Sequence, residues 1–424
     1  MLKWLEDHLL QLNLVDKMNQ PEGFTRLGYS NEENQSIAAF EKIAKELGLE
    51  IKRDQAGNVI ARWIGASEDL PAVAVGSHLD TVVSGGGYDG TAGVLCALGA
   101  VKQLKDEGYQ PTHPIEVIVF RSEESARFGI STIGSKAMAG LLDLQIGSVK
   151  DSSGISIREA VATLGFNWDE FSKAERKKEE LKCFLELHIE QGTVLEENQK
   201  DYGIVDGVAC PIRLKVKVFG LAGHTGTSPM NGRRDALVAV APLISYVSET
   251  ATKLSEENST PVVATVSTME VKPNSINVIP GYVEVGIDIR SVEDSLKKIV
   301  EQSIREKCNE LERLYHVSIE IEKLVDNPSV FLDERIQQQL KKVVSEMGYS
   351  YLMMNSGAGH DVMNMAKKWP SGLIFIPCKD GLSHHPAEHA SLEDMRLGVN
   401  IIAGFLKKEA GGLNEKSTSG SSRA

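Results

Sequence analysis

Apolar and polar positions change period along the chain, and its first half alternates short apolar runs with segments of helical spacing. Residues 73–75 and 115–120 are runs rich in β-branched residues, which predicts buried strands. Residues 91–104 are apolar at helical spacing, Ser30 opens a capping-box sequence, and residues 141–181 are polar and predicted to be helical. This alternation predicts an α/β fold with a mostly parallel sheet and helices on both faces.

From residue 212 onward, the predicted strands alternate apolar and polar residues, so only one face of each is buried. Strands and helices are predicted in turn at 212–219, 234–252, 262–271, 282–289, 292–314 and 317–321. The order β-α-β-β-α-β predicts an inserted ferredoxin-like α+β domain with an antiparallel sheet and both helices on one face. The predicted domains are a main domain in two parts, 1–211 and 326–410, the insertion at 212–325, and a disordered tail at 411–424.

Composition narrows the class of protein. With 424 residues, 42% of them hydrophobic and 25% charged, the chain should form two or more globular domains. A formal net charge of -13 argues against a nucleic-acid or anionic-membrane partner. The five cysteines are scattered and form no CxxC pair, which predicts a reducing, cytoplasmic location. Acidic residues interrupt the apolar residues of the N-terminus, so it is not a signal peptide, and no run approaches the ~18 apolar residues of a membrane span.

Side chains that can bind metals stand at the C-terminal ends of four predicted strands, where open α/β sheets place their chemistry. The first end carries His78 and Asp80, and three consecutive glycines then let the chain turn back and present Asp89. Glu123 and Glu124 follow the strand predicted at 115–120. Two further apolar runs, 183–187 and 373–376, are also predicted to be strands, and His188 and His384 follow them. A single zinc ion needs only three protein ligands and a water. Five ligand candidates around one central carboxylate therefore predict two metal ions bridged by Asp89.

The remaining acids near this site have predicted roles in proton transfer. Two cations can lower the pKa of a shared water from about 15.7 towards 7. Glu123 could then move the proton, while Asp80 could hydrogen-bond the ring nitrogen of His78 that does not face the metal.

Nine motifs carry a resemblance to a known family: GSHLDTV, GGGYDGTAGV, SEESARFG, ELHIEQG, AGHTGTSPM, PNSINVIPG, DIR, SGAGHD and SHHPAEH. Together they resemble the di-zinc amidohydrolases of the aminoacylase/carboxypeptidase superfamily over about residues 2–408. Within it, they resemble the branch of N-carbamoyl-L-amino acid hydrolases, allantoate amidohydrolases and β-ureidopropionases. The resemblance implies one metal on His78, Asp89 and His188, and the second on Asp89, Glu124 and His384. It also implies Glu123 as general base and Asp80 as the residue that orients His78.

The same resemblance implies a substrate site shared with the insertion, which would act as a lid and a dimerisation domain. His224 would stabilise the oxyanion, from its own chain or from a partner subunit of a homodimer. Asn277 and Arg290 would hold the substrate carboxylate, and Gln191 and Gly359 would line the pocket. The roles of His360 and Asp361 stay open, and His385 and His389 are expected to be neighbours of the ligand His384.

The predicted reaction is metal-dependent hydrolysis of a small N-carbamoyl-L-amino acid to amino acid, ammonia and carbon dioxide. The ions would be zinc, or manganese, cobalt or nickel. His188 favours a carbamoyl or ureido substrate, since peptidase relatives use a carboxylate there. Allantoate is the main alternative, followed by β-ureidopropionate and by a di-zinc peptidase or deacylase. A metal-free scaffold is disfavoured by the complete ligand set. Two residues depart from the pattern of the family that the chain resembles. Ser125 stands where relatives commonly have a glycine, and His389 stands where an aromatic residue is usual. Both differences are expected to alter the shape of the pocket and not the metal ligands.

Overall fold

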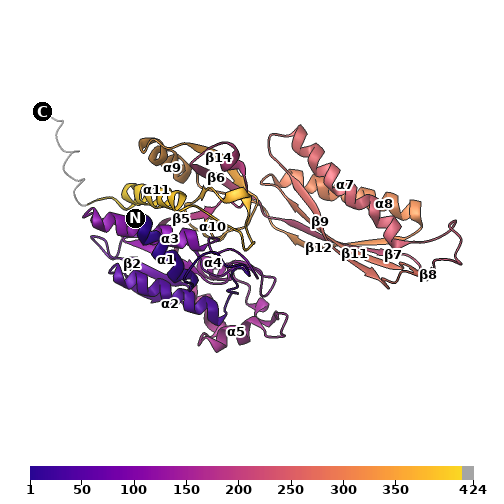
Figure 1. The fold of residues 1–424 in the computed structure, drawn as a ribbon, viewed down its shortest axis with the longest axis horizontal. Helices are drawn as coiled ribbons and strands as arrows, with labels where there is room; N and C mark the ends of the chain where they lie inside the picture. The colour runs from indigo at the N-terminus through magenta and orange to yellow at the C-terminus, as the bar shows by residue number, and fades with distance from the viewer. Residues whose placement is uncertain (413–424) are drawn as a thin grey trace. The chain divides into compact units, whose positions relative to one another are not determined.

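The computed structural model describes residues 1–412, and they fall into two compact units (Figure 1). The first unit contains residues 1–206 and 332–354 and resumes at residue 360, and the second contains 207–331 and 355–359. The predicted disordered tail, 411–424, lies outside the described residues except for its first two positions.

A nine-stranded mixed sheet is the centre of the first unit, and some of its strands run on into the second. Its strands are β1 (Glu50–Arg53), β2 (Val59–Trp63), β3 (Ala72–His78), β4 (Ile115–Phe120), β5 (Leu181–Ile189), β6 (Tyr202–Val208), β13 (Val330–Phe331), β14 (Tyr351–Ser356) and β15 (Ser371–Ile376). The order is β1-β2-β4-β3-β5-β15-β6-β13, and β14 also pairs with β6. The four central strands β4, β3, β5 and β15 are parallel. The flanking β1, β2, β6 and β13 are antiparallel, so the sheet is parallel only at its centre.

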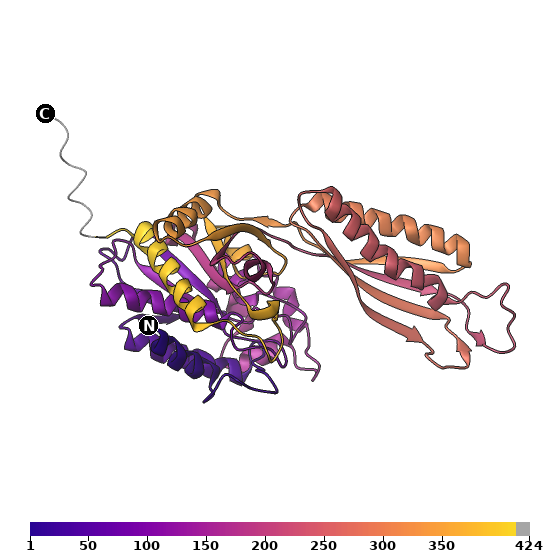
Figure 2. The ribbon, with the colours of Figure 1, turned by 45° about the horizontal axis from the view of Figure 1, so that its top comes forward.

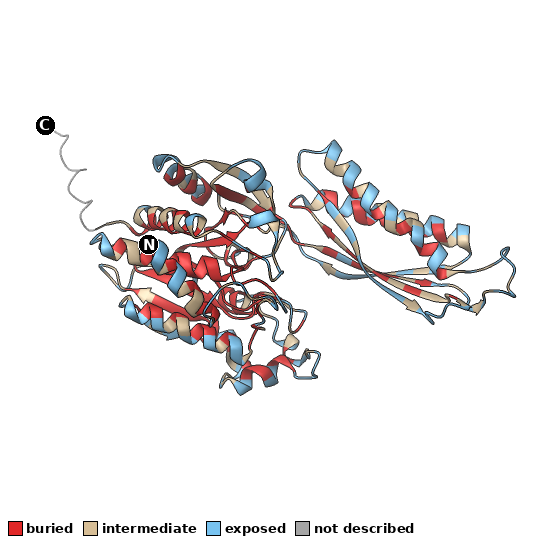
Figure 3. Ribbon diagram, viewed as in Figure 1, coloured by how far each residue is buried: buried red, intermediate tan, exposed pale blue. Residues whose placement is uncertain are grey.

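Helices cover both faces of this sheet. They are α1 (Leu2–Asn13), α2 (Asn31–Glu46), α3 (Thr91–Asp106), α4 (Ile133–Ala139), α5 (Ile157–Thr163), α6 (Val194–Glu197), α9 (Glu334–Glu346), α10 (Val362–Met365) and α11 (Leu392–Ala410). The long helices α1, α2, α3, α9 and α11 pack on one face and share one apolar core with it, drawn in red in Figure 3. The short α4 and α10 pack on the other face.

The alternation of β5 shows how the sheet divides its residues between these faces. Cys183, Leu185 and Leu187 point into the large core. Glu186 and His188 therefore point to the opposite face, because successive strand residues alternate sides. Glu186 and His188 can therefore both contribute to a functional site on that face of the sheet.

The segment 141–181 differs from the single polar helical stretch that was predicted. It contains α5 and three short 3-10 helices, Leu144–Ser148, Trp168–Ala174 and Lys178–Glu180, and a fourth 3-10 helix lies at Lys379–Gly381. Gly154 and Gly165 have positive φ angles of 81° and 86° and interrupt any longer helix. Trp168 and Phe171 are buried in a separate small core with α4 and α5, so the segment is not wholly solvated.

The second unit has the predicted ferredoxin-like order. Its elements are β7 (Ile212–Phe219), β8 (Gly223–His224), α7 (Ala236–Glu257), β9 (Val263–Lys272), β10 (Val278–Ile279), β11 (Tyr282–Arg290), α8 (Asp294–Tyr315) and β12 (Ser318–Asp326). The four main strands form an antiparallel sheet in the order β12-β7-β11-β9. Both helices lie on one side of this sheet in the two views of Figure 1 and Figure 2. In β7, Leu214 and Val216 are buried towards the helices, whereas Arg213 and Lys217 point to the other face.

Candidate metal centre

The strand ends predicted to carry metal ligands meet at one edge of the first unit's sheet. β4, β3, β5 and β15 are adjacent and parallel, so their C-terminal ends lie together. The ligand atoms of His78, Asp89 and His188 lie within 4.8 Å of one another, and so do those of Asp89, Glu124 and His384. All five predicted ligands are therefore brought together, in two groups that share Asp89.

The two carboxylate oxygens of Asp89 face different groups. Oδ1 lies 3.3 Å from His78 Nε2 and 3.1 Å from His188 Nε2. Oδ2 lies 3.4 Å from His384 Nε2, and that nitrogen is 3.1 Å from Glu124 Oε1. A carboxylate with one oxygen towards each of two ligand sets has the geometry of a bridge between two cations.

The residues present fit a pair of divalent cations. Burial alone would raise the pKa of Asp89, but the surrounding His188, His384 and His78 hold it well below its ordinary value. Hydrogen bonds to Asp89 and Glu124 raise the pKa of His384 to about 11. A positive charge is therefore needed between each of these imidazole nitrogens and the carboxylate oxygen that it faces. Either a proton or a metal ion can supply it. Nitrogen and oxygen donors in sets of three suit zinc and its first-row neighbours.

The two buried histidines are oriented by bonds to their other ring nitrogen. His78 Nδ1 lies 3.0 Å from the backbone oxygen of Asp80, and His188 Nδ1 lies 2.9 Å from that of Ile189. These contacts direct both Nε2 atoms at Asp89, as in many histidine metal ligands.

Asp80 has a further role that the sequence did not reveal. Its carboxylate oxygens accept the backbone N–H groups of Glu123 at 3.0 Å and of Glu124 at 2.9 Å. Its Oδ1 is 3.4 Å from His78 Nδ1, so the carboxylate also lies close enough to orient that ring. Asp80 thus connects the end of β3 to the paired glutamates that follow β4.

Glu123 lies beside the two ligand groups without belonging to either. Its Oε2 is 3.9 Å from His78 Nε2, and the residue is buried. Burial raises the pKa of Glu123 well above its ordinary value. The charge of His78 opposes this shift, and the neighbouring Glu124 and Asp361 add to it. A carboxyl group in this environment can accept and hold a proton near neutral pH.

Gln191 and Ser383 contact the central aspartate. Gln191 Nε2 donates to Asp89 Oδ2 at 2.7 Å, and Ser383 Oγ lies 2.9 Å from the same oxygen. Gln191 was predicted to contact substrate, and in this structure its amide is bound to Asp89 and Ser383. Neither contact is readable from the sequence, because the two residues are far from Asp89 along the chain.

The residues whose roles were left open differ in burial: His360 and Asp361 are buried, whereas His385 and His389 are exposed. The His360 ring is buried, with its centroid 4.5 Å from that of His188 and 5.6 Å from that of Phe375. Asp361, next to it, is fully buried. His385 and His389 are exposed and belong to neither ligand group, and His389 Nδ1 is 3.1 Å from the Tyr88 hydroxyl.

The predicted substrate residues of the second unit lie at opposite ends of β11. At one end, β8 pairs with β10 and sets His224 opposite Val278, and the N–H of Thr225 donates to the carbonyl of Asn277. At the other end, Arg290 bonds to Asp288 and to the carbonyl of Gly357 at 2.7 Å, in the segment that also contains Gly359. β11 has nine residues, so these ends are roughly 27 Å apart at the rise of an extended strand. The unit therefore does not bring His224 and Asn277 to Arg290.

This fold and this cluster of ligand-type side chains fit a metal-dependent enzyme, and the family and relatives of the chain show that it is a hydrolase acting on C–N bonds. The chain belongs to peptidase family M20/M25/M40, whose family model matches residues 74–408. Within residues 1–412, no helix is long and apolar enough to cross a membrane.

Several relatives are named as amidohydrolases or as ureidoglycolate hydrolases. An N-carbamoyl-L-amino acid amidohydrolase of Geobacillus stearothermophilus is 37% identical, over 94% of this chain and 96% of the relative. A ureidoglycolate hydrolase of Arabidopsis thaliana is 36% identical over 91% and 82%, and an allantoate amidohydrolase of Escherichia coli is 33% identical over 90% and 92%. The crystal structure of a hydantoinase/carbamoylase family amidase from Burkholderia multivorans aligns with a TM-score of 0.85 and 30% identity, over 97% of this chain and 98% of that one.

Proposed function

We propose that the protein hydrolyses an N-carbamoyl-L-amino acid to the free amino acid, ammonia and carbon dioxide, with two divalent metal ions in each subunit. The observation that carries the proposal is Asp89, with one carboxylate oxygen towards each ligand group. The similarity to the Geobacillus stearothermophilus enzyme supports the carbamoyl substrate. Histidine at position 188 also supports it, since peptidases resembling this chain have a carboxylate there.

Allantoate is the second candidate substrate. The Escherichia coli relative is an allantoate amidohydrolase, and allantoate combines ureido groups with a carboxylate that an arginine could hold. The Arabidopsis thaliana relative adds ureidoglycolate, which has the same two features. All these substrates share the reaction class, hydrolysis of a ureido C–N bond.

In the proposed site, His78, Asp89 and His188 hold one ion, and Asp89, Glu124 and His384 hold the other. The ions are zinc, or manganese, cobalt or nickel. When bound, they supply Lewis acidity at the ureido carbonyl and lower the pKa of a nearby water.

The proton is moved by Glu123. Its carboxylate accepts a proton from the attacking water and delivers it to the leaving nitrogen. Burial and the neighbouring Glu124 raise the pKa of Glu123, which lets the carboxyl hold this proton between the two steps. Asp80 keeps Glu123 in place through the backbone N–H bond.

Substrate binding is assigned to residues of both units. Arg290 holds the substrate carboxylate through its planar guanidinium, together with Asn277, and Gln191 and Gly359 line the pocket. His224 donates a hydrogen bond to the oxyanion that forms on the ureido carbonyl.

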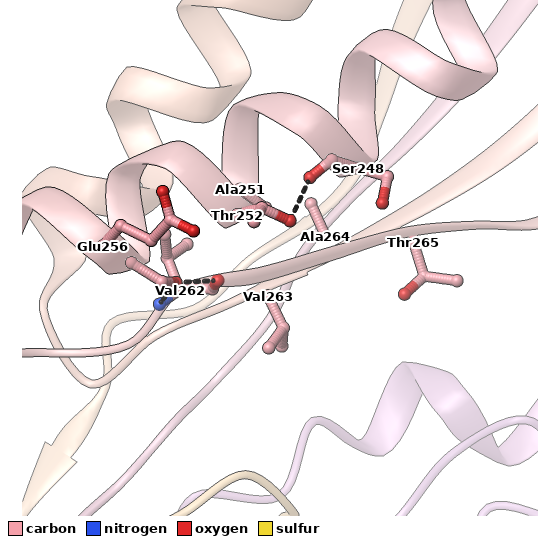
Figure 4. A pocket seen from close by; sticks show the side chains of 9 residues that line it. Ser248, Ala251, Thr252, Glu256, Val262, Val263, Ala264 and Thr265 are labelled. Carbon is pink, nitrogen blue, oxygen red and sulfur yellow. Dashed lines mark hydrogen bonds between the residues drawn. The ribbon is translucent and has the colours of Figure 1, made fainter.

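A homodimer accounts for the separation of these groups within one chain. If Arg290 and His224 serve one substrate molecule, they must come from two chains, because they lie at opposite ends of β11, which is roughly 27 Å long. β9 is one of the two edge strands of its sheet, and its start and the last turns of α7 line a hollow of about 480 Å³ (Figure 4). Val263 at this edge is 57% exposed. A second copy pairing at this edge would bury these surfaces.

The five cysteines are buried and free, which supports a reducing compartment and a cytoplasmic location.

A substrate panel tests the reaction. Metal-reconstituted protein would be offered N-carbamoyl-L-amino acids, allantoate, ureidoglycolate, β-ureidopropionate and a dipeptide, and release of ammonia or amine would be measured. We expect the highest kcat/KM with an N-carbamoyl-L-amino acid. Cleavage of the dipeptide alone would show that the ureido assignment is wrong, and preference for allantoate would move the proposal to the second candidate.

Arg290→Ala should raise KM roughly 10- to 100-fold with a smaller effect on kcat, because the variant loses a charge-assisted bond to the substrate carboxylate. Arg213→Ala is a matched control, since Arg213 also pairs with Asp288, at 2.8 Å, and is not assigned to substrate. The measurement is steady-state kinetics with the carboxylate substrate and with its carboxamide analogue. An equal KM for wild type and Arg290→Ala would show that the carboxylate is bound elsewhere.

A further inference from the structure

One buried carboxylate connects the two loops that carry Asp89 and His384. Glu388 Oε1 accepts the backbone N–H groups of Tyr88 at 3.0 Å and Asp89 at 2.9 Å. Its Oε2 lies 3.0 Å from Ser383 Oγ and accepts the backbone N–H of His384 at 3.2 Å. The residue is 4% exposed. Each oxygen thus serves a different loop, and Asp89 and Glu388 are 299 residues apart in the chain.

The glycine run before Asp89 leaves room for this contact. A Cβ on Gly86 would lie 2.1 Å from the Glu388 carboxyl carbon, a separation that no side chain could adopt. A side chain at position 86 would therefore push the carboxylate away from the Asp89 backbone. The requirement for glycine here comes from Glu388 as well as from the turn.

His384 depends on this support more than the other proposed histidine ligands. His78 and His188 lie on buried strands, and their rings are fixed by backbone oxygens. His384 lies on a loop, its side chain is 49% exposed, and its backbone has a positive φ of 56°. This conformation is unfavourable for a residue other than glycine and has to be held by its surroundings.

We propose that Glu388 is a positioning residue for the metal centre, which holds the His384 loop and the Asp89 backbone at the separation that the second ion requires. The inference rests on the two-metal function proposed above. The affected group is Asp89, Glu124 and His384. Loss of Glu388 leaves His78 and His188 in place, so the first ion loses support only at the shared Asp89. The second ion loses support at both Asp89 and His384 and is weakened more.

Glu388→Gln tests this with little change in shape. A glutamine has one acceptor oxygen, so its NH₂ group must face either the two N–H groups of residues 88 and 89 or the N–H of His384. One loop loses its acceptor in either orientation. We expect the affinity for the second ion to fall about 10- to 100-fold, the range seen when a group supporting a metal ligand is removed. The first ion should lose less affinity than the second, because His78 and His188 do not depend on Glu388.

The readout is metal binding, measured by competition of Zn²⁺ or Co²⁺ with a chromophoric chelator and by metal content after dialysis. Gly86→Ala is a second variant, which keeps the carboxylate and displaces it, and it should show the same selective loss. Asp54→Asn is a matched control, because Asp54 is a buried carboxylate that accepts the N–H groups of Ala56 and Asn58 in a hairpin turn. Its metal affinities should equal those of wild type.

The outcomes separate this inference from the proposed function. The role of Glu388 is supported if wild type binds two ions and folded Glu388→Gln or Gly86→Ala loses affinity mainly for the second ion. Two ions bound with wild-type affinity in both variants overturn the role of Glu388 and leave the two-metal function intact. Wild type that binds only one ion overturns the two-metal function and this inference with it.

Discussion

Glu123→Gln should abolish turnover and leave the metal content unchanged. Glutamine keeps the size of the side chain, but it can neither accept the proton of the attacking water nor return it to the leaving nitrogen. Removal of a general base typically lowers kcat by about 10²- to 10⁴-fold. Metal binding should persist because Glu123 belongs to neither ligand group. The measurements are single-turnover kinetics and metal analysis of the same preparation.

The neighbouring Glu124→Gln is the matched control. Glu124 is adjacent in sequence and similarly buried, but its Oε1 lies 3.1 Å from His384 Nε2 within the second ligand group. This variant should lose activity together with metal. Retained turnover in Glu123→Gln would remove the assignment of Glu123 as base. Metal loss in Glu123→Gln would instead place it among the ligands.

The central strands were predictable because both of their faces are buried. β3 and β4 therefore appear in the sequence as mainly apolar runs. β6 was missed because Gly203, Asp206 and Gly207 break its apolar pattern. The antiparallel direction of β6 and β13 was also missed, since strand direction there is set by tertiary connections that a local pattern does not contain.

The ligand cluster was predictable because metal-binding residues stand at the ends of strands that local patterns identify. His78 and His188 follow directly from their strands. The contacts that support the cluster were not predictable in the same way. Glu388 was visible four residues after His384, but its bonds to the backbone at Asp89 join distant parts of the chain and become evident only in three dimensions.

Mixing two impaired variants, Arg290→Ala and His224→Ala, should restore kcat/KM if the proposed site is shared between subunits. In a mixed dimer, the chain carrying His224→Ala contributes an intact Arg290, and its partner contributes an intact His224. One complete site forms, and the other site carries both defects. Random reassortment makes half of the dimers mixed, so about a quarter of wild-type activity should return.

The measurement is kcat/KM, taken at substrate concentrations well below KM, of the two variants after they are unfolded together and refolded at equal concentrations. Each variant refolded alone gives the baseline. Arg213→Ala mixed with His224→Ala is the matched control, and in it activity should come only from sites with an intact His224. If the substrate contacts were supplied within one chain, every site in the first mixture would keep one defect and the activity would stay at baseline. Such a result would require His224 or Arg290 to act outside the substrate site, because the length of β11 prevents both from reaching one small molecule in the same subunit.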